Sequence, residues 1–156
     1  MTVTTRLQQL GVTLPPVAAP VAAYVPARRS GDLVHTSGQL PFVDGALPAT
    51  GKVGEGAGLV SPEEAKRLAR IAGLNALAAA ADAAGGVDRI VRVVKVVGFV
   101  ASDPSFTGQP GVVNGVSELL GKVFGDDGAH ARSAVGVAVL PLDAPVEVEI
   151  TVEVAA

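Results

Sequence analysis

The chain has 156 residues, of which 12 are basic and 15 acidic, so its formal net charge is −3. It contains no cysteine, which excludes disulfides, iron–sulfur clusters and thiolate chemistry. The length fits one domain with a core that needs no covalent cross-links. The negative charge and an aromatic content of 3% disfavour a nucleic-acid-binding protein, which needs clustered basic side chains and stacking surfaces.

The first 20 residues predict an N-terminal extension that precedes a single domain over residues 21–156. They start with an amphipathic segment and continue into a stretch rich in proline. No apolar run in the sequence approaches the roughly 18 residues that a membrane-spanning helix needs, and the first residues lack the apolar centre of a secretory signal. We therefore expect a cytoplasmic protein with no membrane partner. Because residues 1–18 are rich in threonine and proline, we expect them to lie outside any functional site.

Two short strands are predicted near the start of the domain, over residues 24–28 and 33–37. The turn-forming residues Ser30-Gly31-Asp32 lie between them and indicate a hairpin. Residues 41–58 are rich in glycine and form a predicted loop that is long enough to be functional or mobile.

Two amphipathic helices are predicted in the middle of the chain. The first spans residues 61–84, because Ser61 and the proline after it favour a helix start and a glycine pair ends the pattern. The second covers residues 112–124, where apolar side chains recur at helical spacing. Between the helices, residues 90–100 are mostly apolar on both alternating faces, which predicts a strand covered on both sides.

The last two predicted strands cover residues 132–140 and 146–154, and the turn between them indicates a second hairpin. The final strand alternates valine or isoleucine with glutamate or threonine, so it has one apolar face. The complete order predicts an α+β fold with a mixed β-sheet and two helices packed on one face. Because two helices cannot also cover the other face, to which two strands contribute apolar residues, we expect an oligomer.

Two charged residues of the predicted C-terminal hairpin are candidates for a binding site. Arg132 shares its strand face with Ala134 and Gly136, and such small side chains leave room for a ligand beside the guanidinium. An arginine holds one carboxylate bidentately, although an arginine at a strand edge also commonly pairs with a surface acid. Glu147 lies on the other strand of the hairpin, and the strand register decides whether it faces Arg132 or belongs to a solvated row of acids.

Other residues carry weaker signals. Ser37 and Gly38 end a predicted strand and offer a hydroxyl group and a flexible backbone, although taken alone such a pair more often has a structural role. Tyr24 is the sole tyrosine, and a packed position at the rim is its simplest role. Asn114 lies in the first turn of the second helix, where capping or solvent exposure is usual. The two histidines lack the spacing of metal ligands, so no metal site is predicted.

Taken together, several segments resemble the RidA/YjgF family, also known as the L-PSP endoribonuclease-like family. Each motif alone is common, but their order and spacing over most of the chain are specific. The segments are Tyr24, Thr36–Pro41, Val97–Val100, Asn114, Ala131–Val135, Leu140-Pro141 and Val146–Glu149.

The resemblance implies a chorismate-mutase-like fold and a homotrimer with sites in the clefts between subunits. It also implies a deaminase, a hydrolase that converts reactive 2-imino acids such as 2-aminoacrylate to 2-oxo acids and ammonia. No cofactor is implied, because an imine is already electrophilic. Two other functions stay open: a non-catalytic trimer that binds a small carboxylate for regulation, and an endoribonuclease, which the acidic charge disfavours.

The same resemblance implies a role for each residue of the site. Arg132 would clamp the substrate carboxylate, and Glu147 would position or deprotonate the attacking water or stabilise the iminium. The Ser37 hydroxyl group and the backbone at Gly38 would orient the substrate.

The remaining site residues implied by the resemblance are Tyr24, Asn114 and Ala134. Tyr24 and Asn114 would line the pocket, and the neighbouring subunit can supply them. Ala134 stands where active deaminases often have a cysteine, and Gly136 stands where a glutamate is common.

Overall fold

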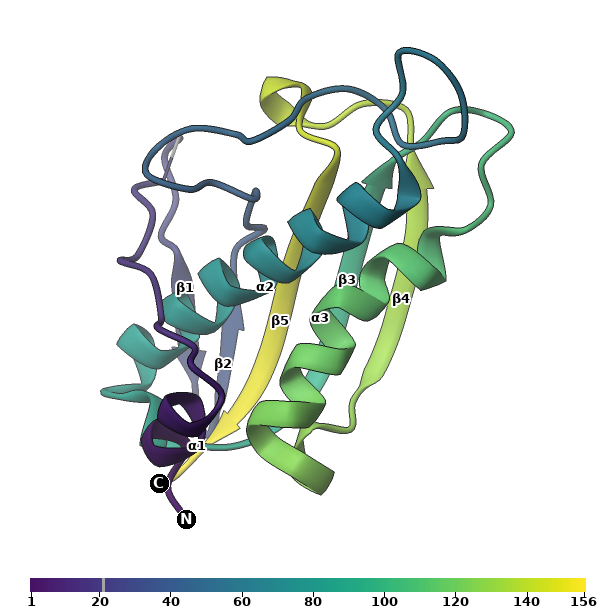
Figure 1. Ribbon diagram of the computed structural model, residues 1–156. Helices are drawn as coiled ribbons and strands as arrows, with labels where there is room; N and C mark the ends of the chain where they lie inside the picture. Colours follow the sequence, from purple (N-terminus) through teal and green to yellow (C-terminus); the bar gives the residue numbers. More distant parts are fainter. Residues whose placement is uncertain (21) are drawn as a thin grey trace.

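A mixed β-sheet lies behind two long helices in the computed structural model, which describes residues 1–20 and 22–156 (Figure 1). The strands are β1 (Ala27–Ser30), β2 (Leu33–Thr36), β3 (Ile90–Ala101), β4 (Ala131–Val137) and β5 (Val146–Val154). Their order across the sheet is β1-β2-β5-β3-β4, and every pair is antiparallel except β3–β4, which is parallel. The predicted α+β class is confirmed.

The helices α2 (Pro62–Ala84) and α3 (Gln109–Phe124) both lie on one face of this sheet (Figure 1). Both predicted helices are confirmed, although α3 begins at Gln109 rather than at residue 112. A short helix α1 (Val3–Gln9) precedes the sheet, and three short 3-10 helices connect the later elements: η1 (Val87–Arg89), η2 (Gly125–Gly128) and η3 (Pro141–Asp143). No helix among residues 1–20 and 22–156 has both the length and the apolar character needed to span a membrane.

The ends of α2 follow from its sequence. The Ser61 hydroxyl oxygen accepts a hydrogen bond from the Glu64 backbone N–H at 3.2 Å, and Pro62 occupies the first turn, where its missing N–H costs no helical bond. At the other end Gly85 has a φ of 87°, a left-handed conformation that favours glycine. The helix therefore has defined boundaries before any packing is considered.

The hydrophobic core lies between the two long helices and the sheet. Apolar side chains of α2 and α3 meet one face of the central strands, where they are shielded from water. Its large, fully buried members include Leu68, Leu77, Val96, Val100, Val112, Val113, Val116, Leu120 and Ile150.

Glycine allows α2 and α3 to approach each other closely. Gly115 of α3 lies against the backbone carbonyl of Lys66 on α2, and a Cβ atom there would overlap that oxygen. The neighbour is backbone and cannot swing away as a side chain can. Gly115 therefore fixes the separation of the two helices that cover the core.

We expect Gly115→Ala to lower the free energy of unfolding by about 2–3 kcal/mol, because the added methyl group forces the helices apart. Gly121→Ala on the same helix is the matched control: a Cβ atom there meets nothing within 4 Å. This control should be neutral or up to about 1 kcal/mol more stable, since alanine favours a helix over glycine. Urea denaturation of both variants measures the difference, and equal midpoints would contradict the prediction.

The predicted hairpin between the last two strands is wrong. Among the described residues β4 pairs with β3 alone, in parallel, whereas β5 lies between β2 and β3. The segment β3-α3-β4 is a strand–helix–strand unit, and a helical crossover is the usual way to place two neighbouring strands parallel. The turn after β4 therefore carries the chain past β3 to the middle of the sheet.

The first predicted hairpin is confirmed, with a different starting residue. β1 begins at Ala27, not at Tyr24, and pairs with β2. Pro26 precedes it and has no N–H to donate to a ladder, which explains why the strand does not extend further back. The predicted loop over residues 41–58 is anchored in its second half, where Val53 is fully buried and its N–H donates to the Ala101 carbonyl at 2.6 Å.

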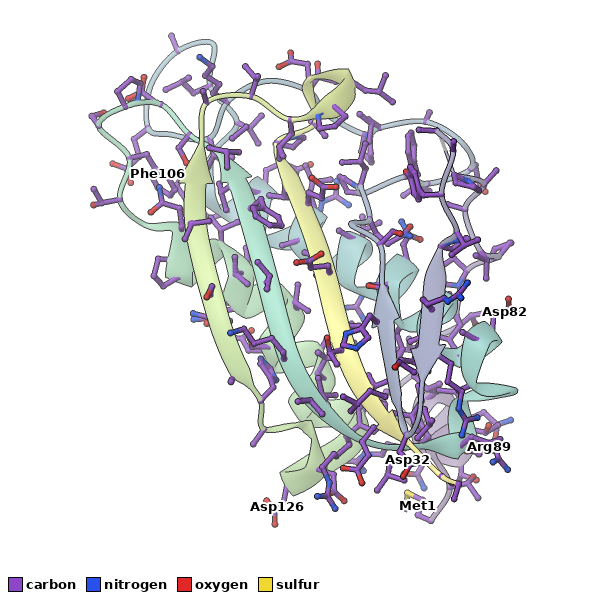
Figure 2. All side chains as sticks on the ribbon, turned by 180° about the vertical axis from the view of Figure 1, so that it is seen from behind. Met1, Asp32, Asp82, Arg89, Phe106 and Asp126 are labelled. Atoms are coloured by element: carbon purple, nitrogen blue, oxygen red, sulfur yellow. The ribbon has the colours of Figure 1, made fainter. Side chains whose placement is uncertain are left out.

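The second face of the sheet has no helix over it within the described residues (Figure 2). Val97 and Phe99 of β3 are half-buried on this open face, and Val135 of β4 beside them is 44% exposed. Glu147 and Glu149 of β5 share the same face. Helices therefore cover only one face of strand 90–100, whereas the sequence predicted cover on both faces.

The N-terminal helix packs against the rest of the protein. Leu7 of α1 is buried and contacts the buried Leu119 and Val123 of α3. Thr4 donates two hydrogen bonds to the Asp88 carboxylate, from its N–H at 2.8 Å and its hydroxyl at 2.7 Å. The contacts of α1 are with α3 and η1, so this helix supports the scaffold.

Removal of residues 1–11 is expected to lower the free energy of unfolding by about 2–3 kcal/mol, the usual effect of losing one buried leucine and its contacts. We also expect any imine hydrolysis to survive, in keeping with the prediction that residues 1–18 are not catalytic. Thermal melts and ammonia release measure the two effects separately. An inactive truncated protein with an unchanged assembly would contradict this expectation.

Candidate active site

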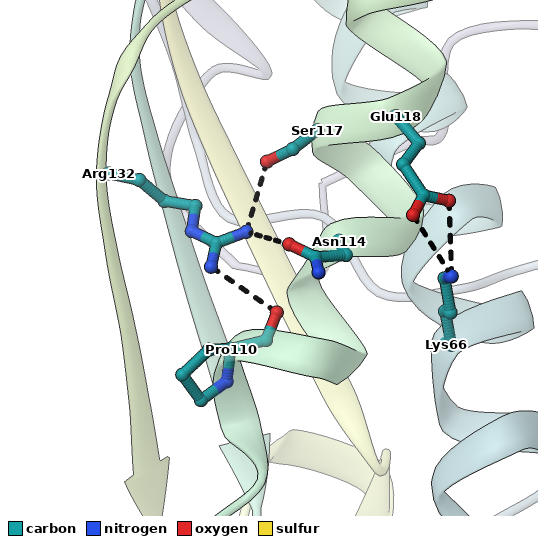
Figure 3. Close-up of polar contacts among 6 residues, drawn as sticks. All are labelled: Lys66, Pro110, Asn114, Ser117, Glu118 and Arg132. Atoms are coloured by element: carbon teal, nitrogen blue, oxygen red, sulfur yellow. Dashed lines mark hydrogen bonds and ion pairs between the residues drawn. The ribbon is translucent and has the colours of Figure 1, made fainter.

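Arg132 is held against α3 at the edge of the sheet. It lies opposite Val96 in the β3–β4 register and faces the helices. Its Nη1 donates to Asn114 Oδ1 at 2.7 Å and to Ser117 Oγ at 3.1 Å, and its Nη2 donates to the Pro110 carbonyl at 3.3 Å (Figure 3). These partners are all on α3, so the helix fixes the guanidinium in one orientation.

Two of the five N–H groups of Arg132 stay available. A guanidinium has two hydrogens on each Nη and one on Nε. The three bonds to α3 use both hydrogens of Nη1 and one of Nη2. Within residues 1–20 and 22–156 no acceptor takes the Nε–H or the second Nη2 hydrogen. Nε and Nη2 lie on the side edge of the guanidinium, and together they can hold both oxygens of one carboxylate.

The space beside Arg132 is smaller than the sequence predicts. Ala134 is half-buried and packs against the core. Above Gly136 lie the side chains of Gln109 and Ser102, and a Cβ atom on this glycine would come within 2.8 Å of Gln109 Nε2. Small residues on this strand face therefore serve the close packing of Ser102 and Gln109, and the outer edge of the Arg132 guanidinium is the part left for a ligand.

Glu147 occupies a different part of the molecule. It lies opposite Phe99 in the β3–β5 register, on the open face of the sheet. The chain after β2 runs beside it, because Gln39 and Val148 exchange two backbone hydrogen bonds of 2.8 and 3.0 Å. Gly38 contacts the Glu147 carboxylate, and a Cβ atom at residue 38 would overlap it. Glycine thus allows the carboxylate to lie against the backbone.

The pKa of Glu147 is raised above its usual value. Burial is the main cause, because a partly desolvated carboxylate favours its neutral form, and the nearby Glu149 carboxylate adds a like charge. A carboxyl group with a raised pKa exchanges protons more readily near neutral pH than an ordinary glutamate. Among the acids of the open face, this makes Glu147 suited to acid–base chemistry.

The raised pKa has a consequence for stability. The folded state favours protonated Glu147, so this contribution is present at low pH and is lost as pH rises through the raised pKa. We expect Glu147→Gln to become progressively more stable than the parent as pH rises from about 4 to 7, the range above an ordinary glutamate pKa. Urea titrations at several pH values measure this, with exposed Glu55→Gln as the control. Parallel curves for parent and Glu147→Gln would contradict it.

Ser37 and Tyr24 lie near Gly38 but differ in availability. The Ser37 hydroxyl group donates to the Val25 carbonyl at 2.6 Å, so its proton is already used and only its oxygen can accept. Tyr24 is 43% exposed and lines a small hollow together with Gly38 and Phe42. Residues 18–20 line the same hollow. The end of the predicted N-terminal extension therefore reaches this part of the site.

Comparison with known proteins decides the family. The sequence model of the family described as "YjgF/chorismate_mutase-like, putative endoribonuclease" matches residues 4–154. The chain belongs to this YjgF family. The resemblance stated from the sequence motifs is confirmed.

Individual YjgF-type relatives cover nearly the whole chain. "Protein TCP17" of Trypanosoma cruzi is 45% identical over 97% of this chain and 93% of its own. A Shewanella oneidensis protein, described as a "putative endoribonuclease", is 32% identical with a TM-score of 0.92, covering 99% of this chain and 100% of that one. Escherichia coli TdcF, solved with bound serine, is 25% identical with a TM-score of 0.63, covering 92% and 94%.

The predicted site residues of this YjgF-family chain fall into two groups. Arg132 and Asn114 come together on the helix side of the sheet edge. Glu147 and Gly38 are in contact on the open face, with Ser37 next to them in the chain. Because Arg132 faces the helices and Glu147 faces away from them, one subunit does not bring the two charged residues together.

Sequence reasoning missed two groups that hold Arg132, the Ser117 hydroxyl and the Pro110 carbonyl, and it also missed His130, which is hydrogen-bonded to Ser117. A signal for Ser117 was present, because it follows Asn114 by three residues and so shares its helix face. Within residues 1–20 and 22–156, no three histidine, aspartate or glutamate side chains are arranged to hold a metal ion.

Proposed function

We propose that this protein hydrolyses 2-imino acids to 2-oxo acids and ammonia. The observation that carries the proposal is the orientation of Arg132, whose Nη1 is fully engaged by α3 while its Nε–Nη2 edge is free for a carboxylate. In the reaction R–C(=NH)–COO⁻ + H₂O → R–C(=O)–COO⁻ + NH₃, the carboxylate is unchanged and serves as the fixed point of the substrate.

Arg132 supplies binding and orientation. Its two free N–H groups make a pair of charge-assisted hydrogen bonds to the substrate carboxylate, a geometry that lysine cannot reproduce. The relative TdcF was solved with bound serine, a small molecule that carries such a carboxylate beside its nitrogen. A small α-amino- or α-imino-acid ligand is therefore consistent with the family.

Glu147 moves the protons. Water attacks the imine carbon, its proton passes to Glu147, and Glu147 delivers that proton to the nitrogen as the tetrahedral carbinolamine forms. In the collapse of that intermediate, Glu147 takes the hydroxyl proton and passes it to the amine nitrogen, the C–N bond breaks, ammonia leaves and the new carbonyl forms. The pKa of Glu147 is raised by burial and by the Glu149 carboxylate, which makes this side chain a better proton acceptor than an ordinary glutamate. The chemistry needs no cofactor, since the imine is already electrophilic.

The complete site requires more than one subunit. Arg132 and Glu147 face opposite sides of the same sheet, so each substrate needs Arg132 from one subunit and Glu147 from another. The half-buried Val97 and Phe99 and the exposed Val135 supply an apolar surface on the open face for such an association. A homotrimer with three equivalent sites, the assembly implied by the sequence resemblance, meets this requirement.

Mixed trimers test both parts of this proposal. Arg132→Ala and Glu147→Gln subunits are each expected to retain only a small fraction of the parent activity when assembled alone. Refolding them together in equal amounts should restore about a quarter of the parent activity, because about one site in four then receives an intact residue from each side. Sedimentation equilibrium should report three times the monomer mass. Zero activity in the mixture of two well-folded variants would contradict a shared site, and a monomer would contradict the assembly.

A second function is favoured by Ala134, which stands where active deaminases of the family often have a cysteine. In this second function, the same trimer binds a small carboxylate through Arg132 and does not convert it. Calorimetric titration with 2-oxobutanoate, together with an ammonia assay on imines generated in the same solution by an amino-acid oxidase, separates the two functions. Binding without ammonia release would assign the non-catalytic role.

A further inference from the structure

His130 and Ser117 form a hydrogen-bonded chain behind Arg132. Arg132 Nη1 donates to Ser117 Oγ at 3.1 Å, and Ser117 Oγ lies 2.9 Å from His130 Nε2. The other ring nitrogen, Nδ1, lies 2.6 Å from the Gly128 carbonyl oxygen. All of these side chains are half-buried between β4 and α3.

The direction of each bond in this chain follows from the chemistry of its ends. A carbonyl oxygen only accepts, so His130 Nδ1 carries the proton that it donates to Gly128. In the neutral ring Nε2 is then an acceptor, and the Ser117 hydroxyl hydrogen points to it. The lone pairs of Ser117 are thereby directed away from His130, toward the Arg132 guanidinium.

We propose that His130 is a positioning residue that, through Ser117, holds Arg132 with its Nε–Nη2 edge free for the substrate carboxylate. This inference rests on the proposed function only in naming the ligand. Without the His130 acceptor, the Ser117 hydroxyl can rotate and bond to a carbonyl of its own helix, a common alternative for serine within helices. Nη1 then loses one of its two fixed partners, and the guanidinium gains freedom that binding must remove.

The chain segment before β4 is built to support this arrangement. Gly128 is buried where η2 packs against α3, and a Cβ atom there would overlap the Leu120 carbonyl. The absence of a side chain lets the turn approach the helix closely, which places the Gly128 carbonyl within reach of His130 Nδ1. The turn, the ring and the helix thus fix the position of the Ser117 oxygen together.

Three variants separate positioning from general stability. His130→Leu removes the ring acceptor and keeps an apolar side chain. His130→Gln retains an oxygen that can accept from Ser117, so it is the conservative replacement. Ser117→Ala removes the link to Arg132. We expect His130→Leu and Ser117→Ala to raise KM for the imine, or the dissociation constant for 2-oxobutanoate, by about tenfold, with kcat changed less than about twofold. His130→Gln should keep KM and the dissociation constant close to the parent values.

The double variant tests whether His130 acts through Ser117. If it does, His130→Leu combined with Ser117→Ala should bind no worse than Ser117→Ala alone, because the first change has nothing left to act on. The inference would be overturned if the two changes weakened binding independently, so that their effects on KM multiplied in the double variant. An unchanged KM in His130→Leu would overturn it as well. The inference would also be overturned if His130→Leu and His130→Gln lowered kcat by the same factor and the melting temperature by the same amount. That pattern marks a purely structural residue.

Nitrogen NMR gives a readout that does not depend on any activity. The neutral His130 ring should show a protonated Nδ1 and an unprotonated Nε2, and the Nε2 chemical shift should change in Ser117→Ala. The separate Nη resonances of Arg132, which report hindered rotation, should merge in His130→Leu and stay separate in His130→Gln. If the parent protein shows these signals but binds no 2-oxobutanoate, the proposed function is refuted and the positioning role stands. If the His130 ring is protonated at Nε2 instead of Nδ1, the positioning role is refuted and the proposed function stands.

Discussion

Replacing Arg132 by alanine is expected to lower kcat/KM for imine hydrolysis by roughly a hundred- to a thousandfold. The change removes a bidentate, charge-assisted contact whose loss corresponds to ~3–4 kcal/mol of transition-state binding. Arg132→Lys should recover only part of this, because an ammonium group cannot present two parallel N–H groups. The measurement is ammonia release from imines generated in solution, with protein variants checked for folding and assembly.

Exposed Arg67 provides the control for this experiment. It lies on α2, where it pairs with Glu64 on the same helix, and Arg67→Ala removes the same charge without touching β4 or the open face. Its rate should match that of the parent. Near-normal hydrolysis by Arg132→Ala would refute the carboxylate clamp, and an equal loss in Arg67→Ala would show that net charge matters more than position.

Gly38→Ala is expected to lower kcat by roughly ten- to a hundredfold while leaving the fold nearly unchanged. The new methyl group occupies the position of the Glu147 carboxylate, so that side chain has to move away from its place. The stability cost is small because the displaced group is the far end of a flexible side chain. Loss of a positioned proton-transfer group commonly costs this much rate.

The matched control is Gly111→Ala, at a glycine of α3 where an added Cβ meets nothing within 4 Å. Glu147→Gln completes the set, because it keeps the shape of the side chain and removes its acid–base function. We expect Gly38→Ala and Glu147→Gln to lower kcat far more than they raise KM. A Gly38→Ala variant with normal kcat would show that the position of Glu147 against the backbone is irrelevant to turnover.

The shared site that we propose would account for the separation of the two charged residues within one subunit. Arg132 stands on an edge strand, and Glu147 stands near the middle of the sheet on the other face. If both were on one face, each subunit could bind substrate alone, and the open face would have no catalytic role. Under the proposed function, their separation makes assembly a condition of activity, and the mixed-trimer experiment tests this dependence directly.

Local sequence signals determined the helices, most strands and the family. The cap at Ser61, the left-handed Gly85 and the alternation along residues 146–154 depend only on neighbouring residues, and the structure confirms each of them. The motif order identified the family for the same reason, since it is a property of the chain alone. Arg132 and Asn114 were singled out in this way, and they are in contact.

Only the tertiary structure decided how the candidate residues meet. Sequence proximity favoured a hairpin of β4 and β5, with Arg132 and Glu147 on its two strands. The structure places β3 between these strands, because the crossover through α3 places β4 parallel to β3 at the sheet edge. Strand pairing depends on contacts between distant segments, which alternation patterns do not encode. The same holds for the bonds from Arg132 through Ser117 to His130: a sequence lists such donors and acceptors, and packing sets their distances and directions.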